Sequence, residues 1–118
     1  MLRILSLLES NEIVLHLFNE RSSEIYLSLF LNKDDDEYFD TIEWYQSIFT
    51  ELKEHIINNE PYVINLDYRY SIVEYKNNIL YITISSDNKY TMNFVHDISD
   101  IKDSIIFDLS NLIELLKI

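Results

Sequence analysis

Residues 2–31 follow the two-residue period of β-strands. Apolar side chains recur at alternate positions in two runs: Ile13, Leu15 and Leu17, then Ile25, Leu27, Leu29 and Leu31. Polar residues at 10–11 and 19–23 separate these runs and predict turns. We therefore expect three antiparallel strands, although the leucine-rich stretch Leu2–Leu8 fits either a strand or a short helix.

Residues 36–58 show the clearest helical period in the chain. Apolar positions spaced alternately by four and three residues form one stripe: Tyr38, Ile42, Tyr45, Phe49, Leu52 and Ile56. Acidic residues at 34–36 complement the helix dipole and can cap the first free N–H groups. The pair Asn58-Asn59 before Pro61 predicts the end of the helix, because Asn tolerates the left-handed conformation and the residue before proline disfavours helix.

A second β block follows from Tyr62 to Val95. Its centre is a hairpin of residues 70–76 and 79–85 around Asn77-Asn78, since a two-residue Asn-Asn loop suits a type I′ turn. We expect an edge strand at 62–67 and a further strand at 89–95 after a turn at 86–88.

The chain ends in a second predicted helix, about Ser99 to Lys117. Its apolar stripe comprises Ile101, Ile105, Leu109, Leu112 and Leu116, and Ser99 or Asp97 is the expected cap. The order βββ–α–ββββ–α predicts a single α+β domain over residues 1–118, with an antiparallel sheet of about six to seven strands and two helices packed on one face.

Charge narrows the classes of function. The 118 residues contain 21 Asp and Glu against 9 Lys and Arg, a formal net charge of −12. This excess argues against direct binding to nucleic acid or to anionic membranes, and it favours a basic protein partner. The alternative interpretation is that the acidic residues only keep the protein soluble.

The chain contains no cysteine and no glycine. Disulfides, thiolate nucleophiles and cysteine-ligated zinc are therefore excluded. Phosphate-binding loops, the dinucleotide fingerprint and the nucleophile elbow each lack their essential glycine, so we expect no catalysis and no cofactor. With neither a signal peptide nor a membrane-spanning run apparent, the expected location is the cytoplasm.

The densest cluster of chemical groups spans residues 34–45, where six carboxylates and four aromatic rings occur in twelve residues. Three interpretations remain open: a solvated helix cap, a binding surface for Lys and Arg, or a divalent-cation site, although the glycine of a calcium loop is missing. For the binding surface, Trp44 would supply an aromatic anchor. The alternative is that Trp44 packs under a loop or against the sheet edge. The expected partner-binding residues are Asp34, Asp35, Asp36, Glu37, Asp40, Glu43 and Trp44, with Asp67 and Tyr68 adjoining them.

Other candidate groups carry weaker signals. His16, His55 and His96 have no metal-ligand spacing, so no metal site is expected. His55 could act as a base oriented by Glu51 four residues earlier, which is an enzyme hypothesis.

The second β block is rich in tyrosine: Tyr62, Tyr68, Tyr70, Tyr75, Tyr81 and Tyr90. If the sheet face that carries part of this set is open, rigid amphipathic rings could pair with a second copy. The alternative function is therefore a homo-oligomeric structural or assembly subunit.

In charge, size and lack of catalytic motifs, the chain resembles small acidic inhibitors. These include immunity proteins that neutralise toxin nucleases and phage-encoded anti-defence proteins that imitate DNA with carboxylates. The resemblance implies a non-catalytic protein that occludes the basic active site or nucleic-acid-binding groove of a partner such as a nuclease.

Overall fold

The computed structural model describes residues 2–9, 11–20, 24–66, 71–86 and 90–117. Within them the chain forms seven strands and two helices in the predicted order, and Leu2–Leu8 belongs to a strand. The elements are β1 (Leu2–Glu9), β2 (Glu12–Glu20), β3 (Glu24–Asn32), α1 (Tyr38–Asn58), β4 (Tyr62–Leu66), β5 (Ser71–Lys76), β6 (Ile79–Ser86), β7 (Tyr90–Asp97) and α2 (Lys102–Leu115).

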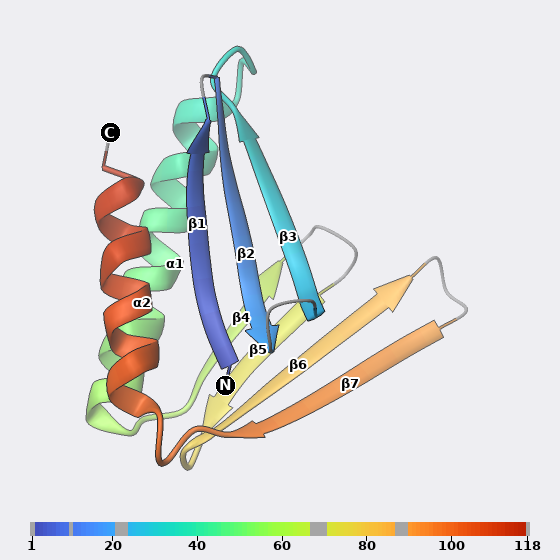
Figure 1. Ribbon diagram of the computed structural model, residues 1–118, viewed down its shortest axis with the longest axis vertical. Coiled ribbons are helices and arrows are strands. Elements are labelled where there is room, and N and C mark those ends of the chain that lie inside the picture. Colours follow the sequence, from blue (N-terminus) through green and yellow to red (C-terminus); the bar gives the residue numbers. More distant parts are fainter. Residues whose placement is uncertain (1, 10, 21–23, 67–70, 87–89, 118) are drawn as a thin grey trace.

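The strands form two antiparallel sheets, so the single sheet predicted from sequence is not confirmed (Figure 1). The first sheet has the order β1-β2-β3 and the second has the order β4-β5-β6-β7. The apolar alternation identifies the buried face of each strand, but it does not specify which strands pair across the intervening helix α1. Each ladder joins only strands that are consecutive in the sequence.

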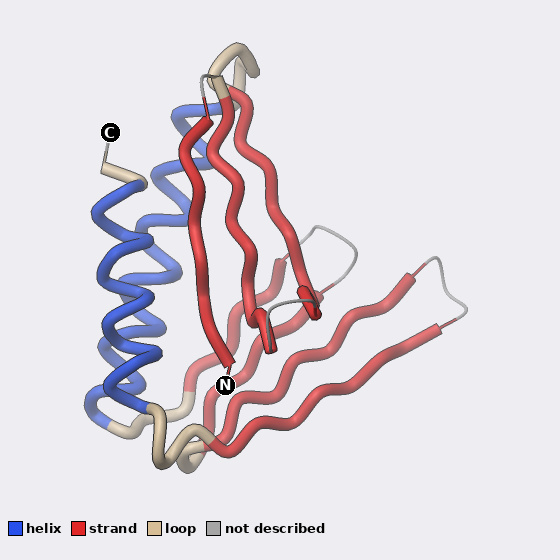
Figure 2. The backbone as a smooth tube through the Cα atoms, viewed as in Figure 1, coloured by secondary structure: helices blue, strands red, loops and turns tan. Residues whose placement is uncertain are grey.

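The helices run antiparallel to each other along one side of the two sheets (Figure 2). Helix α2 packs against the edge strand β1 and against α1, whereas α1 contacts β3 of the first sheet and β4 and β5 of the second. Helix α1 therefore connects the sheets, and the predicted placement of both helices on one face of one sheet is not confirmed. Neither described helix is long and apolar enough to cross a membrane.

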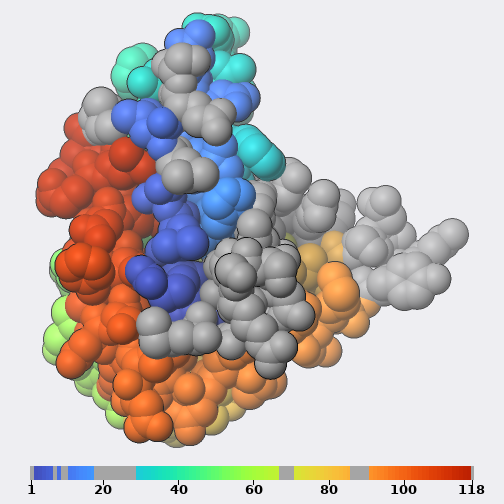
Figure 3. Space-filling model, viewed as in Figure 1, coloured from blue at the N-terminus to red at the C-terminus, as the bar shows by residue number. Residues whose placement is uncertain are grey.

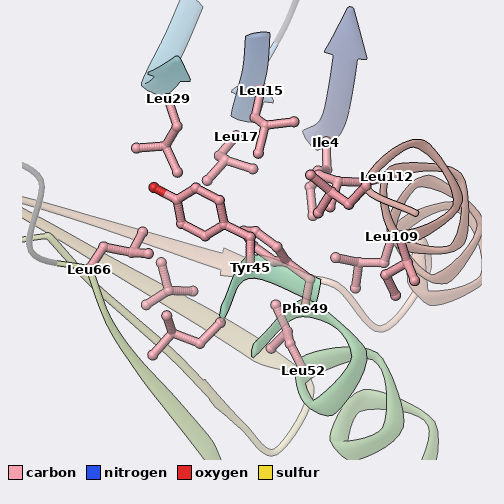
Figure 4. Close-up of a cluster of buried hydrophobic side chains, with 14 of the residues drawn as sticks. Ile4, Leu15, Leu17, Leu29, Tyr45, Phe49, Leu52, Leu66, Leu109 and Leu112 are labelled. Atoms are coloured by element: carbon pink, nitrogen blue, oxygen red, sulfur yellow. The ribbon is translucent and has the colours of Figure 1, made fainter. Parts of the chain in front are cut away.

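One hydrophobic core collects side chains from both sheets and both helices. Tyr45 and Phe49 of α1 lie in its middle, between leucines of the first sheet, Leu66 of the second and Leu109 of α2 (Figure 4). The predicted stripe of α1 is confirmed, since all six of its residues are buried. The burial pattern of β5 also alternates, as the two-residue period predicts.

Asparagine replaces glycine where the backbone needs positive φ. Asn59 ends α1 at φ 52° and ψ 47°, and Asn77 and Asn78 form the β5–β6 turn at φ 49° and 65°. These are the positions predicted from sequence, because Asn tolerates the left-handed region better than most residues.

The predicted cap of the second helix is wrong. Helix α2 starts at Lys102 after Ile101, which makes no side-chain cap bond. The Asp97 carboxylate instead accepts the backbone N–H of Ser99 at 2.9 Å, within the loop before the helix.

A single carboxylate of α2 binds a backbone N–H of the edge strand β1 and the side chain of Arg3. Asp108 is buried, and its Oδ2 accepts the backbone N–H of Ile4 in the edge strand at 3.0 Å. The same carboxylate binds the Arg3 guanidinium through two hydrogen bonds, at 2.7 Å from Nε and 2.8 Å from Nη2. These hydrogen bonds raise the pKa of Arg3 further above its usual value.

Replacing this carboxylate should destabilise the fold. We expect Asp108→Ala to lower the free energy of unfolding by about 2–3 kcal/mol, because it leaves a buried N–H without an acceptor and removes the partner of Arg3. Urea unfolding followed by circular dichroism measures the change. Glu114→Ala is the control on the same helix, since its exposed pair with Lys117 at 3.0 Å should contribute less than about 0.5 kcal/mol. Equal losses in both variants would contradict the role assigned to Asp108.

Candidate functional site

Six exposed carboxylates gather where β3 joins α1, and we call this region the acidic surface. In the space-filling view the corresponding cyan and teal segment forms the upper end of the molecule (Figure 3). The acidic surface consists of Asp34, Asp35, Asp36, Glu37, Asp40 and Glu43. Among the described residues, no Lys or Arg forms an ion pair with any of them.

Local hydrogen bonds fix the loop that carries these acids. The Asn32 side chain accepts the Asp34 N–H at 2.9 Å, and the Asp35 side chain accepts the Glu37 N–H at 3.0 Å. The acids were predicted to cap the first free N–H groups of the helix, and this prediction is only partly confirmed. Asp35 bonds the N–H of Glu37, which lies one residue before the helix. Glu37 itself, at the cap position, makes no side-chain cap bond. The remaining carboxylates of the acidic surface are exposed to solvent.

Two aromatic rings lie exposed among these acids. Trp44 is 39% exposed and stacks at a tilt on buried Tyr45, with 5.1 Å between the ring centroids. Phe39 is 76% exposed and lies edge-on against buried Tyr38 at 5.4 Å. Trp44 is exposed as expected for an anchor. Phe39 was missed, although its position beside the buried stripe, one residue after Tyr38, was a usable signal.

Two of the predicted binding residues, Asp67 and Tyr68, lie outside the described residues, so their place beside the acidic surface stays a prediction. For the cation interpretation, the described His, Asp and Glu side chains form no group of three or more that could hold a metal ion.

A groove of about 420 Å³ continues from the acidic surface between α1 and α2. Glu43 belongs to both, and the far wall is formed by Ile113 of α2 and by Lys117, which follows the helix. The groove is lined by Glu43, Gln46, Ser47, Thr50, Glu51, Ile113 and Lys117. Hydroxyl and carboxylate oxygens on the α1 side therefore extend the hydrogen-bond acceptors of the acidic surface along the helix.

The Glu51–His55 pair does not have the arrangement that the enzyme hypothesis requires. The Glu51 carboxylate accepts the hydroxyl of Tyr62 at 2.6 Å, while His55 Nδ1 donates to the main-chain oxygen of Glu51 at 2.7 Å. The His55 ring stacks on Tyr62 with centroids 4.6 Å apart. Glu51 thus orients His55 through its main-chain carbonyl group, whereas its carboxylate binds the hydroxyl of Tyr62.

The described tyrosines do not gather on one open sheet face. Tyr75 is fully buried and donates its hydroxyl to Asn59 at 2.7 Å, Tyr62 lies against α1, and Tyr81 is partly exposed on the outer face of the second sheet. Tyr68 and Tyr70, and the side chain of Tyr90, lie outside the described part. The outer face instead exposes Val63, Ile72 and Val95.

Comparisons of the chain with protein-family models, curated proteins and solved structures found no match. The surface chemistry of the chain is therefore the basis for assigning a function.

The Tyr62 hydroxyl should lose its proton at a higher pH than an ordinary tyrosine does. Desolvation, then the hydrogen bond and the charge of Glu51, raise the pKa of Tyr62 to about 12. Absorbance at 295 nm, compared between the wild type and Tyr62→Phe, should show about a tenth of this phenol ionised at pH ~11, against about nine-tenths for an ordinary tyrosine. The raised pKa contributes stability below pH ~10 that is lost as the pH rises toward ~12.

Glu51→Gln separates the causes of this shift. The variant should lower the pKa of Tyr62 but leave it above the ordinary value, since desolvation is the largest cause. Glu54→Gln, at an exposed position on the same helix, should leave the titration unchanged. A titration of Tyr62 at the ordinary pKa in the wild type would contradict the observed contact.

Proposed function

We propose that the chain is a non-catalytic acidic binding protein that occludes a basic active site or a nucleic-acid-binding groove of a partner protein. The observation that carries the proposal is the acidic surface, where six exposed carboxylates have no basic partner among the described residues and surround two exposed aromatic rings. An immunity protein or a phage-encoded inhibitor of a nuclease would act in this way.

Unpaired charge of one sign supports fast association. Carboxylates that are not neutralised within their own chain keep their full field, and that field attracts a basic groove from beyond contact distance. To Lys and Arg side chains of the partner, a row of carboxylates presents the same sign of charge as nucleic-acid phosphates. The protein would therefore compete directly with the nucleic acid.

Exposed aromatic rings can supply the binding affinity that surface charge alone does not. Surface ion pairs contribute little affinity in water, whereas aromatic side chains buried at the centre of an interface often dominate its energy. Trp44 and Phe39 lie among the acids, and each ring contacts the ring of a buried tyrosine. The partner would cover these rings while its basic side chains meet the carboxylates and enter the groove beside Glu43.

Removing charge from the acidic surface should slow binding. We expect the combined substitutions Asp34→Asn, Asp36→Asn, Asp40→Asn and Glu43→Gln to lower the association rate with the partner by about tenfold or more at low salt. Asp35 is left unchanged because it supports the loop. The partner is first recovered from the native host by affinity capture and identified by mass spectrometry, and rates are then measured by surface plasmon resonance.

The matched control removes the same number of charges elsewhere. Glu54→Gln, Glu60→Gln, Asp100→Asn and Asp103→Asn change exposed positions outside the acidic surface and should have a much smaller effect. Nucleic acid should displace the wild type from its partner, and binding should weaken as salt rises. Equal binding by the charge-removal variant, or a partner without a basic site, would overturn the proposal.

A further inference from the structure

The groove between α1 and α2 joins polar and apolar surface in one concave site. The two helices lie side by side and contact each other (Figures 1 and 2), and the groove between them measures about 420 Å³. Ile113 of α2 supplies apolar surface and is 8% exposed. Glu43, Ser47 and Glu51 are exposed on the α1 side.

The α1 wall of the groove carries two carboxylates at a defined separation. Glu43, Ser47 and Glu51 follow one another at four-residue intervals of the same helix, so the two acids lie about 12 Å apart along its axis. The Glu51 carboxylate is held by the Tyr62 hydroxyl at 2.6 Å. Part of the cost of ordering this side chain for a ligand is therefore already met within the chain.

The groove has an excess of negative charge. Among the described residues, no ion pair joins Glu43 or Glu51 to a Lys or Arg. Lys117 is the basic residue of the lining, and its Nζ lies 3.0 Å from Oε1 of Glu114. Its charge is thus offset by an acid outside the lining. An occupant of complementary charge carries a cation for each of the two open acids.

We propose that a basic amphipathic α-helix of the partner lies in this groove as a third helix beside α1 and α2. Such docking presupposes the proposed inhibitor function, and it names the element of the partner that the site receives. A helix bonds its own main-chain groups, whereas the side chains of α1 and α2 offer no main-chain edge to an extended strand. Side chains of a third helix can also pack as ridges into the groove between two helices.

The spacing of the acids predicts the sequence of the docked helix. Residues seven apart in a helix lie on one face and about 10.5 Å apart along the axis. The flexible side chains of Lys and Arg span the small difference from the separation of Glu43 and Glu51. An apolar residue midway between the two cations would face Ile113. We therefore expect Lys or Arg at two positions seven residues apart, with an apolar residue between them.

A designed peptide tests this spacing without the natural partner. The probe is an alanine-based helix of about 20 residues that carries two Arg seven positions apart and one Leu midway between them. The control peptide has the same composition, but its two Arg lie five positions apart and point to different sides of the helix. Because each well-placed ion pair contributes a factor of a few, we expect the first peptide to bind at least about fivefold more tightly.

Heteronuclear NMR titrations of the isotope-labelled whole chain give both dissociation constants. The amide signals of Ser47 and Thr50, which line the groove, should shift as the first peptide binds. Equal affinities for the two peptides would show attraction by net charge alone and would contradict docking in the groove.

Ser47→Arg blocks the groove and leaves all six carboxylates of the acidic surface in place. It should weaken binding of the first peptide by about tenfold or more, because it puts a like charge and added volume between Glu43 and Glu51. Asn111→Arg is the matched control, since it adds the same side chain at an exposed position of α2 that does not line the groove. Circular dichroism melting checks that both variants fold. Unchanged peptide binding by Ser47→Arg would refute the proposal.

The natural partner separates helix docking from the proposed function. With the partner recovered by affinity capture, Ser47→Arg should weaken binding as the charge-removal variant does. If only the charge-removal variant weakens it, the partner binds the acidic surface without entering the groove, so helix docking is wrong and the proposed function stands. If neither variant weakens it, the proposed function is wrong as well.

Discussion

Both sheets bury their apolar faces in a core built on the same helix, α1, and among the described strands no ladder connects one sheet to the other. The apolar stripe from Tyr38 to Ile56 is therefore the main structural link between them. The side of α1 opposite this stripe does not pack in the core. That division explains how α1 can carry a buried Tyr45 and an exposed Trp44 at adjacent positions, and how the acidic surface can gather on a helix that the fold depends on.

Edge strands are protected unequally in this fold. The buried Asp108 carboxylate of α2 accepts one backbone N–H of β1, that of Ile4, in a position where a hydrogen bond to charge is strong. Strand β7 has no such cover and no charge of its own between Thr91 and His96. The acidic surface lies elsewhere, where β3 joins α1.

Local features of this fold follow from the sequence, and long-range ones do not. The stripe of α1 and the asparagine turns at 59 and 77–78 were predictable, because periodicity and backbone preference act over a few residues. The division into two sheets was not, since the same alternation in β3 and β4 is compatible with pairing or with separation. The contact between Arg3 and Asp108 joins residues 105 positions apart, and Asp108 looks in sequence like an ordinary helical acid.

In the candidate site, too, local features could be predicted from the sequence and long-range contacts could not. The exposure of the six carboxylates and of Trp44 follows from their positions off the buried stripe. The hydrogen bond of Glu51 to Tyr62 does not, because it depends on where β4 passes α1. Local spacing suggested His55 as the partner of that carboxylate, and tertiary packing supplied a tyrosine instead.

The sequence separation of Arg3 and Asp108 also orders the assembly of the protein. Every strand ladder joins neighbours along the chain, so each sheet can form from local hairpins soon after its strands are synthesised. Strand β1 is synthesised before α2, which carries the carboxylate that accepts the Ile4 N–H. This N–H of the first sheet therefore lacks its acceptor until α2 has been synthesised.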